Sequence, residues 1–347
     1  MRSKPTNLPN STYRLESYFY DLPIERIAQY PLPKRDDAKL MVIDRQRGTI
    51  THDIFAHIGK YLPTHAAVVI NNSKVIPARL LGRKSRTGGE VEVFLLKALD
   101  DGYTFEALLK PLKKIQENEV LDFGHGIEAM LVDREKRLVR FNKKNIFEHL
   151  EGVGHIPLPP YIKREDKASD QEDYQTVYAK HLGSVASPTA GLHFTDKLIN
   201  ELKNDGRMFL ELTLHINYGT FKPVECDDIR QHPMHTEHYT LEASAFRSIM
   251  DAKKDGAPVI AVGTTSARVL ESVARTKTLE GSTDIFIYPG YDFKLVDILI
   301  TNFHLPHSTL LMLVCAFGGY ELVMKAYKEA IKEQYRFYSY GDAMLIL

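Results

Sequence analysis

Residues 186–195, Ala-Ser-Pro-Thr-Ala-Gly-Leu-His-Phe-Thr, place two threonines, a glycine and a histidine together just before a helix start. A loop of this composition presents backbone N–H groups, hydroxyls and one imidazole from a rigid mount. Fixed donors beside a proton carrier are what acid–base chemistry on a bound polar ligand requires. The candidate site residues of this loop are Thr189, Gly191 and His193.

Two further polar loops have the same build, since each follows an apolar strand. Residues 217–221 come after an alternating strand that ends near His215, and residues 301–308 precede a helix. Ligand sites in α/β sheets lie beyond the carboxyl ends of strands, where both loops belong. The alternative is local turn bonding and helix capping. These loops contribute the candidates His215, Tyr218, Asn302 and His304.

The fourth polar loop, residues 262–268, reads Val-Gly-Thr-Thr-Ser-Ala-Arg between an apolar strand and a helix. A glycine followed by hydroxyls at a helix start forms an anion site from free N–H groups and the helix dipole. A carboxylate or a ribose suits it as well as a phosphate. A simple hydroxyl N-cap explains one of these residues but not the whole run. The candidates here are Gly263, Thr264, Thr265 and Arg268.

A histidine-rich segment, residues 232–238, lies six residues beyond Cys226 and raises the possibility of a zinc site. Pro233 breaks any helix that would align His232 with His235, and no paired cysteines accompany them. We therefore expect no metal. A substrate-contacting loop in which His235 and Glu237 carry protons is the favoured interpretation.

The elements that must position these loops alternate between strand and helix from about residue 185. Thr195 is a candidate cap for a helix ending at Gly206, and residues 208–216 alternate as a half-buried strand. Helices are expected at about 241–255 and from about 266, 308 and 320. Strands are expected at 258–262, near 284–288 and at 297–302. This alternation predicts an α/β layered domain, to which a buried strand at 66–71 also belongs.

Between the early strand and this domain the pattern changes to six short strand-like segments separated by glycine turns. They lie near 78–84, 90–98, 103–109, 119–123, 127–133 and 137–141, a spacing typical of a small antiparallel barrel. We therefore predict a barrel domain at 75–146, inserted into a discontinuous domain formed by 1–74 and 147–347.

The composition, 44% hydrophobic and 26% charged over 347 residues, is that of a globular protein of about two domains. Lysines and arginines number 45, equal to the acidic residues, so no global basic excess marks a nucleic-acid binder. The sequence shows no membrane-spanning run and no secretory signal, and residues 1–12 have the character of a frayed extension. Two isolated cysteines, Cys226 and an expectedly buried Cys315, indicate a reducing cytoplasm.

Taken together, the loops resemble the S-adenosylmethionine:tRNA ribosyltransferase-isomerase family of queuosine biosynthesis, from about Tyr20 to the C-terminus. The motifs that carry the resemblance occur in the family's order. They include residues 71–80 (Asn-Asn-Ser-Lys-Val-Ile-Pro-Ala-Arg-Leu), 158–162, 174–179, 188–194, 219–221, 234–237, 263–266, 288–290, 301–306 and 335–344. The family usually has a glycine where Asn217 stands, arginine where Lys74 stands and alanine where Ser187 stands.

The resemblance implies an α/β/α layered domain carrying an inserted six-stranded antiparallel β-barrel. It also implies that the ribosyl group of S-adenosylmethionine is transferred to 7-aminomethyl-7-deazaguanine at the tRNA wobble position and isomerised. The products are epoxyqueuosine-tRNA, adenine and methionine. S-adenosylmethionine is then a co-substrate, with no permanently bound cofactor, and the partners are S-adenosylmethionine and tRNA. A monomer away from membranes is expected.

Within that reaction, histidine suits the required general base and acid, because its pKa lies near working pH. His193 is our first candidate base and Glu237 its candidate partner. The helix start at Gly263–Ser266, with Arg268, is the candidate holder of the methionine carboxylate, and Tyr174, Tyr178 or Tyr218 is expected near adenine or the sulfonium. Candidate phosphate contacts on the barrel side are Lys74, Arg79, Arg83 and Lys84. Two alternatives are a metal-dependent hydrolase and a non-catalytic RNA-binding protein.

Overall fold

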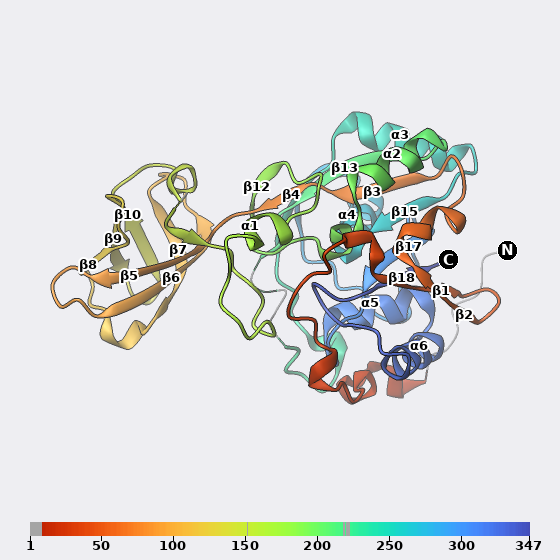
Figure 1. Ribbon diagram of the computed structural model, residues 1–347, viewed down its shortest axis with the longest axis horizontal. Coiled ribbons are helices and arrows are strands. Elements are labelled where there is room, and N and C mark those ends of the chain that lie inside the picture. The colour runs from red at the N-terminus through yellow and green to blue at the C-terminus, as the bar shows by residue number, and fades with distance from the viewer. Residues whose placement is uncertain (1–8, 151, 218, 220–222) are drawn as a thin grey trace.

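The computed structural model describes residues 9–150, 152–217, 219 and 223–347. Tyr218, Thr220 and Phe221, which belong to the second polar loop, lie outside the described residues, as do the first eight residues of the expected extension. Figure 1 shows two parts, a layered α/β body and a smaller barrel standing beside it.

A nine-stranded mixed sheet forms the centre of the body. In spatial order the strands are β16 (Glu280–Thr283), β14 (Glu237–Thr240), β13 (Met208–Leu214), β3 (Ala67–Asn71), β15 (Val259–Val262), β17 (Ile298–Asn302), β18 (Ala343–Ile346), β1 (Lys39–Asp44) and β2 (Thr49–Ile54). The four strands from β13 to β17 are parallel, so their carboxyl ends share one edge. The short apolar runs of β3, β15 and β17 are buried on both faces, whereas β13 is partly exposed.

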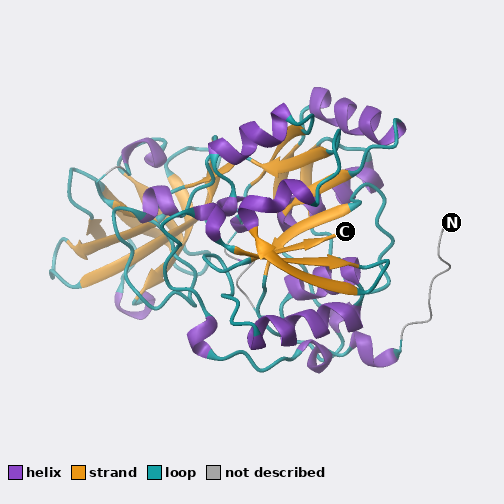
Figure 2. Ribbon diagram, turned by 45° about the vertical axis from the view of Figure 1, so that its right-hand side comes forward, coloured by secondary structure: helices purple, strands orange, loops and turns teal. Residues whose placement is uncertain are grey.

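Helices cover both faces of this sheet, which gives three layers (Figure 2). On one face lie α3 (Ala243–Lys254), α4 (Gly263–Thr276), α5 (Thr309–Gly318) and α6 (Tyr320–Lys332), packed on alternate strand residues such as Val69. On the other face α2 (Asp196–Asn204) and the 3₁₀ helix η5 (Phe55–Lys60) pack on Val68 and Ile70. Thr195 caps α2 as expected, accepting the backbone N–H of Leu198 at 3.1 Å.

The barrel closes as predicted, with six antiparallel strands around a separate apolar core. Around the barrel the strands are β5 (Arg79–Lys84), β6 (Glu90–Ala98), β7 (Thr104–Lys110), β10 (Leu138–Phe141), β9 (Glu128–Asp133) and β8 (Val120–Asp122). β8 returns to β5 at Arg83 and Lys84, and the two-residue β11 (Gly154–His155) pairs with the other end of the same edge of β5. A Cβ on Gly82 would lie 2.5 Å from the carbonyl oxygen of Asp122, so the closing seam requires a glycine.

Between the two parts, β4 (Ser73–Val75) and β12 (His181–Ser184) form a two-stranded parallel sheet, and the short α1 (Asp170–Asp173) packs beside it. The barrel core reaches past the predicted insertion, because Leu150, Val153 and Val185 pack into it. The boundaries at 75 and 146 stay a prediction.

One expected strand is wrong, because residues 284–288 pair with no strand and β16 ends at Thr283. Ile285 and Ile287 are buried in the body core, so their alternation reflects burial rather than strand pairing. The helix expected from about 266 begins at Gly263, whose φ of +89° favours glycine. No single helix among the described residues is long and apolar enough to span a membrane; α5 and α6 pass that test only as a pair bent by 116°.

Candidate functional site

A cavity, called the first pocket below, lies at the carboxyl edge of the parallel strands. Three of the four polar loops line it, together with tyrosines from elsewhere in the chain. The lining includes Ser187, Pro188, Thr189, Gly263, Thr264, Thr265, Arg268, Thr301, Asn302, His304, Tyr161, Tyr174 and Tyr338. Chain segments more than a hundred residues apart therefore converge on one concave surface, which is the usual form of a small-molecule site.

The start of α4 offers free hydrogen-bond donors to this pocket. No side chain caps the helix, whose first three residues line the cavity. Arg268, one turn further along, is only 5% exposed, donates through Nη1 to Glu237 and through Nε to the carbonyl of Ile285. Its Nη2 has no partner among the described residues. A buried guanidinium nitrogen is costly to leave unpaired, so this one indicates a ligand.

Two more polar atoms of the first pocket share that condition. The hydroxyls of Ser187 and Tyr338 are buried and have no hydrogen-bond partner within the described part of the chain. Native proteins pair most buried polar atoms, so three exceptions around one cavity indicate groups that a ligand completes. Ser187, Tyr161 and Tyr338 were not among the sequence candidates, although each lies in or beside a motif quoted for the family resemblance.

His304 faces the first pocket with one ring nitrogen fixed. Its Nε2 is 2.8 Å from the hydroxyl of Thr301, and no partner of Nδ1 exists in the described residues. The hydroxyl of Tyr327 accepts the backbone N–H of His304, which holds the loop in place. Burial lowers the pKa of His304 to about 3, because the charged imidazolium would be desolvated. The ring is therefore neutral near pH 7, and in the tautomer whose Nε2–H donates to Thr301, Nδ1 carries a free lone pair.

His193 is fixed by Asn302 but lines a neighbouring cavity rather than the first pocket. The carboxamide Nδ2 of Asn302 lies 3.0 Å from the carbonyl oxygen of Tyr338, so it must be the donor, and it is 3.3 Å from His193 Nε2. That Nε2 is thus an acceptor, and the proton of the neutral ring sits on Nδ1. Burial first, then Arg336 and Arg35, lower the pKa of His193 to about 3.

The remaining sequence candidates lie apart from the first pocket. His215 packs against Gly183, and burial lowers its pKa. Gly191 is needed because a Cβ there would collide with the Tyr178 hydroxyl. His235 and Glu237 line a smaller cavity on the far side of Arg268. No group of three or more metal-ligating side chains exists among the described residues, which include His232, His235 and His238.

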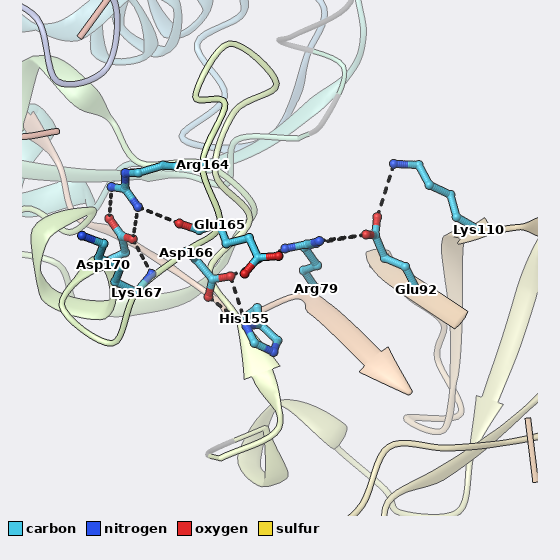
Figure 3. Close-up of polar contacts among 9 residues, drawn as sticks. All are labelled: Arg79, Glu92, Lys110, His155, Arg164, Glu165, Asp166, Lys167 and Asp170. Carbon is cyan, nitrogen blue, oxygen red and sulfur yellow. Dashed lines mark hydrogen bonds and ion pairs between the residues drawn. The ribbon is translucent and has the colours of Figure 1, made fainter. Parts of the chain in front are cut away.

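Two of the four candidate phosphate contacts, Arg79 (Figure 3) and Lys84, are engaged inside the protein. Arg79 is 3.0 Å from Glu92 and 3.6 Å from Asp166, and Asp166 also contacts His155. This cluster ties β5 to the loop that carries Tyr161 of the first pocket. Lys84 is largely buried beside Glu119 at 3.0 Å. By contrast, Arg83 is exposed with only a 3.9 Å contact to Glu90, and Lys74 is exposed.

Figure 3 also shows how the same loop is held to the body. Arg164 binds Asp170 through two nitrogens, each 2.7 Å from a carboxylate oxygen, and Tyr340 donates to the same carboxylate. A bidentate charge-assisted pair of this kind is strong, and Asp170 is fully buried. The position of Tyr161 at the first pocket is therefore anchored from both the barrel and the body.

Comparison with known proteins gives a consistent result along the whole chain. The family described as "Queuosine biosynthesis protein" matches residues 15–346. The S-adenosylmethionine:tRNA ribosyltransferase-isomerases of Sulfurihydrogenibium sp. and Carboxydothermus hydrogenoformans are 48% and 49% identical, each covering 96% of this chain and 100% of the relative. A crystal structure of the S-adenosylmethionine tRNA ribosyltransferase from Thermotoga maritima is 36% identical with a TM-score of 0.56, covering 95% of this chain and 100% of that one.

Proposed function

The chain belongs to the queuosine biosynthesis protein family, and from this premise we propose that it is an S-adenosylmethionine:tRNA ribosyltransferase-isomerase. It transfers the ribosyl group of S-adenosylmethionine to 7-aminomethyl-7-deazaguanine at the tRNA wobble position and isomerises it. The products are epoxyqueuosine-tRNA, adenine and methionine. The unpartnered Nη2 of Arg268, buried in the wall of the first pocket, is the observation that carries the proposal at the level of the site.

S-adenosylmethionine occupies the first pocket in this proposal, with its carboxylate at the start of α4. The free N–H groups of that helix and Arg268 Nη2 supply donors and positive charge for an anion. The rings of Tyr161 and Tyr338 lie 4.5 Å apart in the same wall, and burial raises the pKa of Tyr338. Neutral aromatic faces of this kind attract a sulfonium cation and stack on adenine.

The chemistry begins at the ribose C5′, whose hydrogens are acidified by the adjacent sulfonium. We propose that His304, rather than His193, removes that proton, because His304 faces the first pocket with Nδ1 free. The electron pair left on C5′ breaks the ring C4′–O4′ bond, and the released oxygen expels adenine from C1′ as C1′ becomes an aldehyde; the departing adenine takes up a proton. The tRNA amine adds to C4′ of the resulting vinyl sulfonium and loses a proton, and the C5′ carbanion that this addition forms bonds to C1′ and closes the carbocycle. The alkoxide left on C1′ then displaces methionine from C5′, which forms the epoxide. The hydrogen bond between Asn302 and His193 instead holds side chains that separate the first pocket from the neighbouring cavity.

Adenine release tests the reaction as a whole. The purified protein, S-adenosylmethionine and tRNA carrying the aminomethyl base should yield one adenine and one methionine for each tRNA modified, with no release when the base is absent. Metal analysis accompanies the assay, because a stoichiometric zinc with hydrolytic activity would support the hydrolase alternative. Absence of adenine release with fully modified tRNA would leave only a binding role and overturn the proposal.

Arg268→Lys tests the carboxylate site, because lysine keeps the charge beside Glu237 but loses the second nitrogen. We expect KM for S-adenosylmethionine to rise about 10- to 100-fold with little change in KM for tRNA, as for loss of a charge-assisted hydrogen bond. Arg247→Lys on the exposed face of α3 is the matched control. An unchanged KM for S-adenosylmethionine would place the carboxylate elsewhere.

A cytoplasmic, monomeric state is also proposed, in keeping with two free cysteines.

A further inference from the structure

A second cavity with about 450 Å³ of empty space adjoins the first pocket, and we call it the second pocket. The two share Ser339, and the hydrogen bond from Asn302 to His193 crosses the wall between them. Its lining is Pro31, Leu32, Pro33, Arg35, Ala38, Asp173, Leu192, His193, Arg336, Ser339, Tyr340 and Gly341. A group bound here would therefore lie one side chain away from a ligand in the first pocket.

The second pocket combines several donors with one carboxylate. Because His193 Nε2 accepts from Asn302, its Nδ1 carries a proton, and no described residue accepts it. Among the described residues Arg35 binds only the carbonyl oxygens of Gln175 and Glu172, so no carboxylate in that part of the chain neutralises its charge. Arg336 lies 3.7 Å from Asp342 through Nε and donates to a carbonyl through Nη1.

Asp173 supplies the acceptor of the set. It is half-exposed, lines the cavity, and forms no hydrogen bond or ion pair with any described residue. The pocket therefore holds two guanidinium groups and one carboxylate, and the charge of Arg336 is offset by Asp342 behind it. This pattern fits a neutral heterocycle with both kinds of edge better than it fits a phosphate, which would be repelled by Asp173.

An aromatic platform stands beside this cavity. Tyr30, which directly precedes the lining residue Pro31, is 50% exposed, and Arg336 of the lining donates to its carbonyl. Arg164 and Lys167 lie 4.5 and 4.9 Å from the centre of its ring. An exposed ring flanked by cations is suited to single-stranded RNA, whose bases stack on aromatic faces while its phosphates meet positive charge.

We propose that the second pocket binds the extruded wobble base of the tRNA, with Asp173 accepting from its N1–H and 2-amino groups and the arginines and His193 donating to its O6. Tyr30 stacks on a neighbouring nucleotide at the entrance. The inference rests on the proposed function and adds the place where the RNA base is read. The bound base lies against the wall that carries His193, so its aminomethyl group reaches the first pocket past Ser339.

The test compares anticodon stem-loop RNAs that carry guanine or hypoxanthine at the wobble position, since hypoxanthine lacks only the 2-amino group. The wild-type protein should bind the guanine RNA about 10-fold more tightly, the scale of one lost hydrogen bond to a charged group. Asp173→Asn should abolish most of this preference. Glu172→Gln, its exposed neighbour on α1, should retain it. Tyr30→Ala should weaken the binding of both RNAs about equally, by roughly 10-fold.

A preference that survives in Asp173→Asn overturns the inference. So does an Asp173→Asn protein whose KM rises for S-adenosylmethionine while RNA binding is unchanged, because the second pocket would then hold the amino acid end of that substrate. Adenine release by the wild-type protein separates this failure from failure of the proposed function. The stem-loop measurement needs no turnover, so folded but inactive variants still give a result.

Discussion

The barrel and the layered body differ in whether their polar side chains have partners within the protein. In the barrel, charged side chains meet partners from neighbouring strands or turns, as with Arg79 and Glu92, Lys84 and Glu119, and Arg140 and Asp101. In the body, the first pocket leaves Ser187, Arg268 Nη2 and Tyr338 without partners inside the described chain. The barrel pairs these charged groups internally, apart from the buried Oε1 of Glu119, whereas the first pocket gathers three polar groups that a ligand can complete.

This difference shows which sequence signal carries functional information. A cluster of basic residues in the barrel suggested RNA contacts, yet two of its members pair internally. A run of small polar residues at the start of α4 suggested an anion site, and the structure leaves its donors free. Because a buried polar atom without a partner costs more than an exposed charge gains, several such atoms gathered around one cavity indicate a ligand site better than charge density does.

A comparison of Arg268→Ala in the body with Arg83→Ala in the barrel should give the largest difference in the free energy of unfolding between the two parts. Removing Arg268 leaves the buried carboxylate of Glu237 without its guanidinium partner, so we expect a loss of about 3–5 kcal/mol in the free energy of unfolding. Removing Arg83 breaks an exposed 3.9 Å contact and should change stability by less than about 0.5 kcal/mol. Urea unfolding measures both, and equal losses would contradict the contrast.

Gly82→Ala tests whether the barrel is as tightly closed as the pairing of β5 with β8 implies. The new methyl group would meet the backbone oxygen of Asp122 at 2.5 Å, so we expect a destabilisation of about 1–3 kcal/mol. Gly89→Ala is the control, since its nearest neighbours would lie at 3.6 Å. Thermal unfolding of both variants decides the point, and a tolerated alanine at 82 would show that the seam opens readily.

The pH dependence of stability should report the buried histidines of the body. Because their folded-state pKa is about 3 while an unfolded histidine has about 6.5, the unfolded chain binds protons first as the pH falls. Stability should therefore be lost below pH 6.5, by about 2 kcal/mol for each histidine between pH 6.5 and 5. His193→Asn and His304→Asn should each flatten the slope.

The control for that slope is His125→Asn in an exposed barrel turn, where the positive φ of +51° suits asparagine. Urea unfolding at several pH values compares slopes rather than absolute stabilities, so a variant that is less stable overall remains informative. Slopes equal to that of the wild type in both body variants would mean that neither histidine is held neutral by burial.

Local patterns predicted the elements well, because they depend on residues near each other in sequence. The cap at Thr195, the alternation of β13 and the six barrel strands are of this kind. Pairings between distant segments left no such signal. Strand β18 joins β1 across about 300 residues, and Arg268 meets Glu237 through the fold, so the completed sheet and the buried ion pair became visible only in three dimensions.

The same distinction between local patterns and long-range contacts applies to the candidate site. The sequence identified the loops that line the first pocket, since two of them follow strands β15 and β17 of the parallel sheet and the third follows the short strand β12. It did not separate His304, which faces that pocket, from His193, which faces the next one. That distinction depends on which way a ring points after the Asn302 carboxamide has engaged it, and no spacing rule encodes such an orientation.

The smallest effect is expected at the barrel surface, from Arg83→Glu. Exposed phosphate contacts contribute modestly and additively, so reversal of one charge should weaken tRNA binding several-fold and lower the magnitude of the salt slope by about 1. Lys84→Gln should instead act through the barrel, because Lys84 is already paired with Glu119. Binding measured at several salt concentrations separates the two. If Arg83→Glu left affinity and slope unchanged, tRNA would have to dock on the body alone, through the surface around Tyr30.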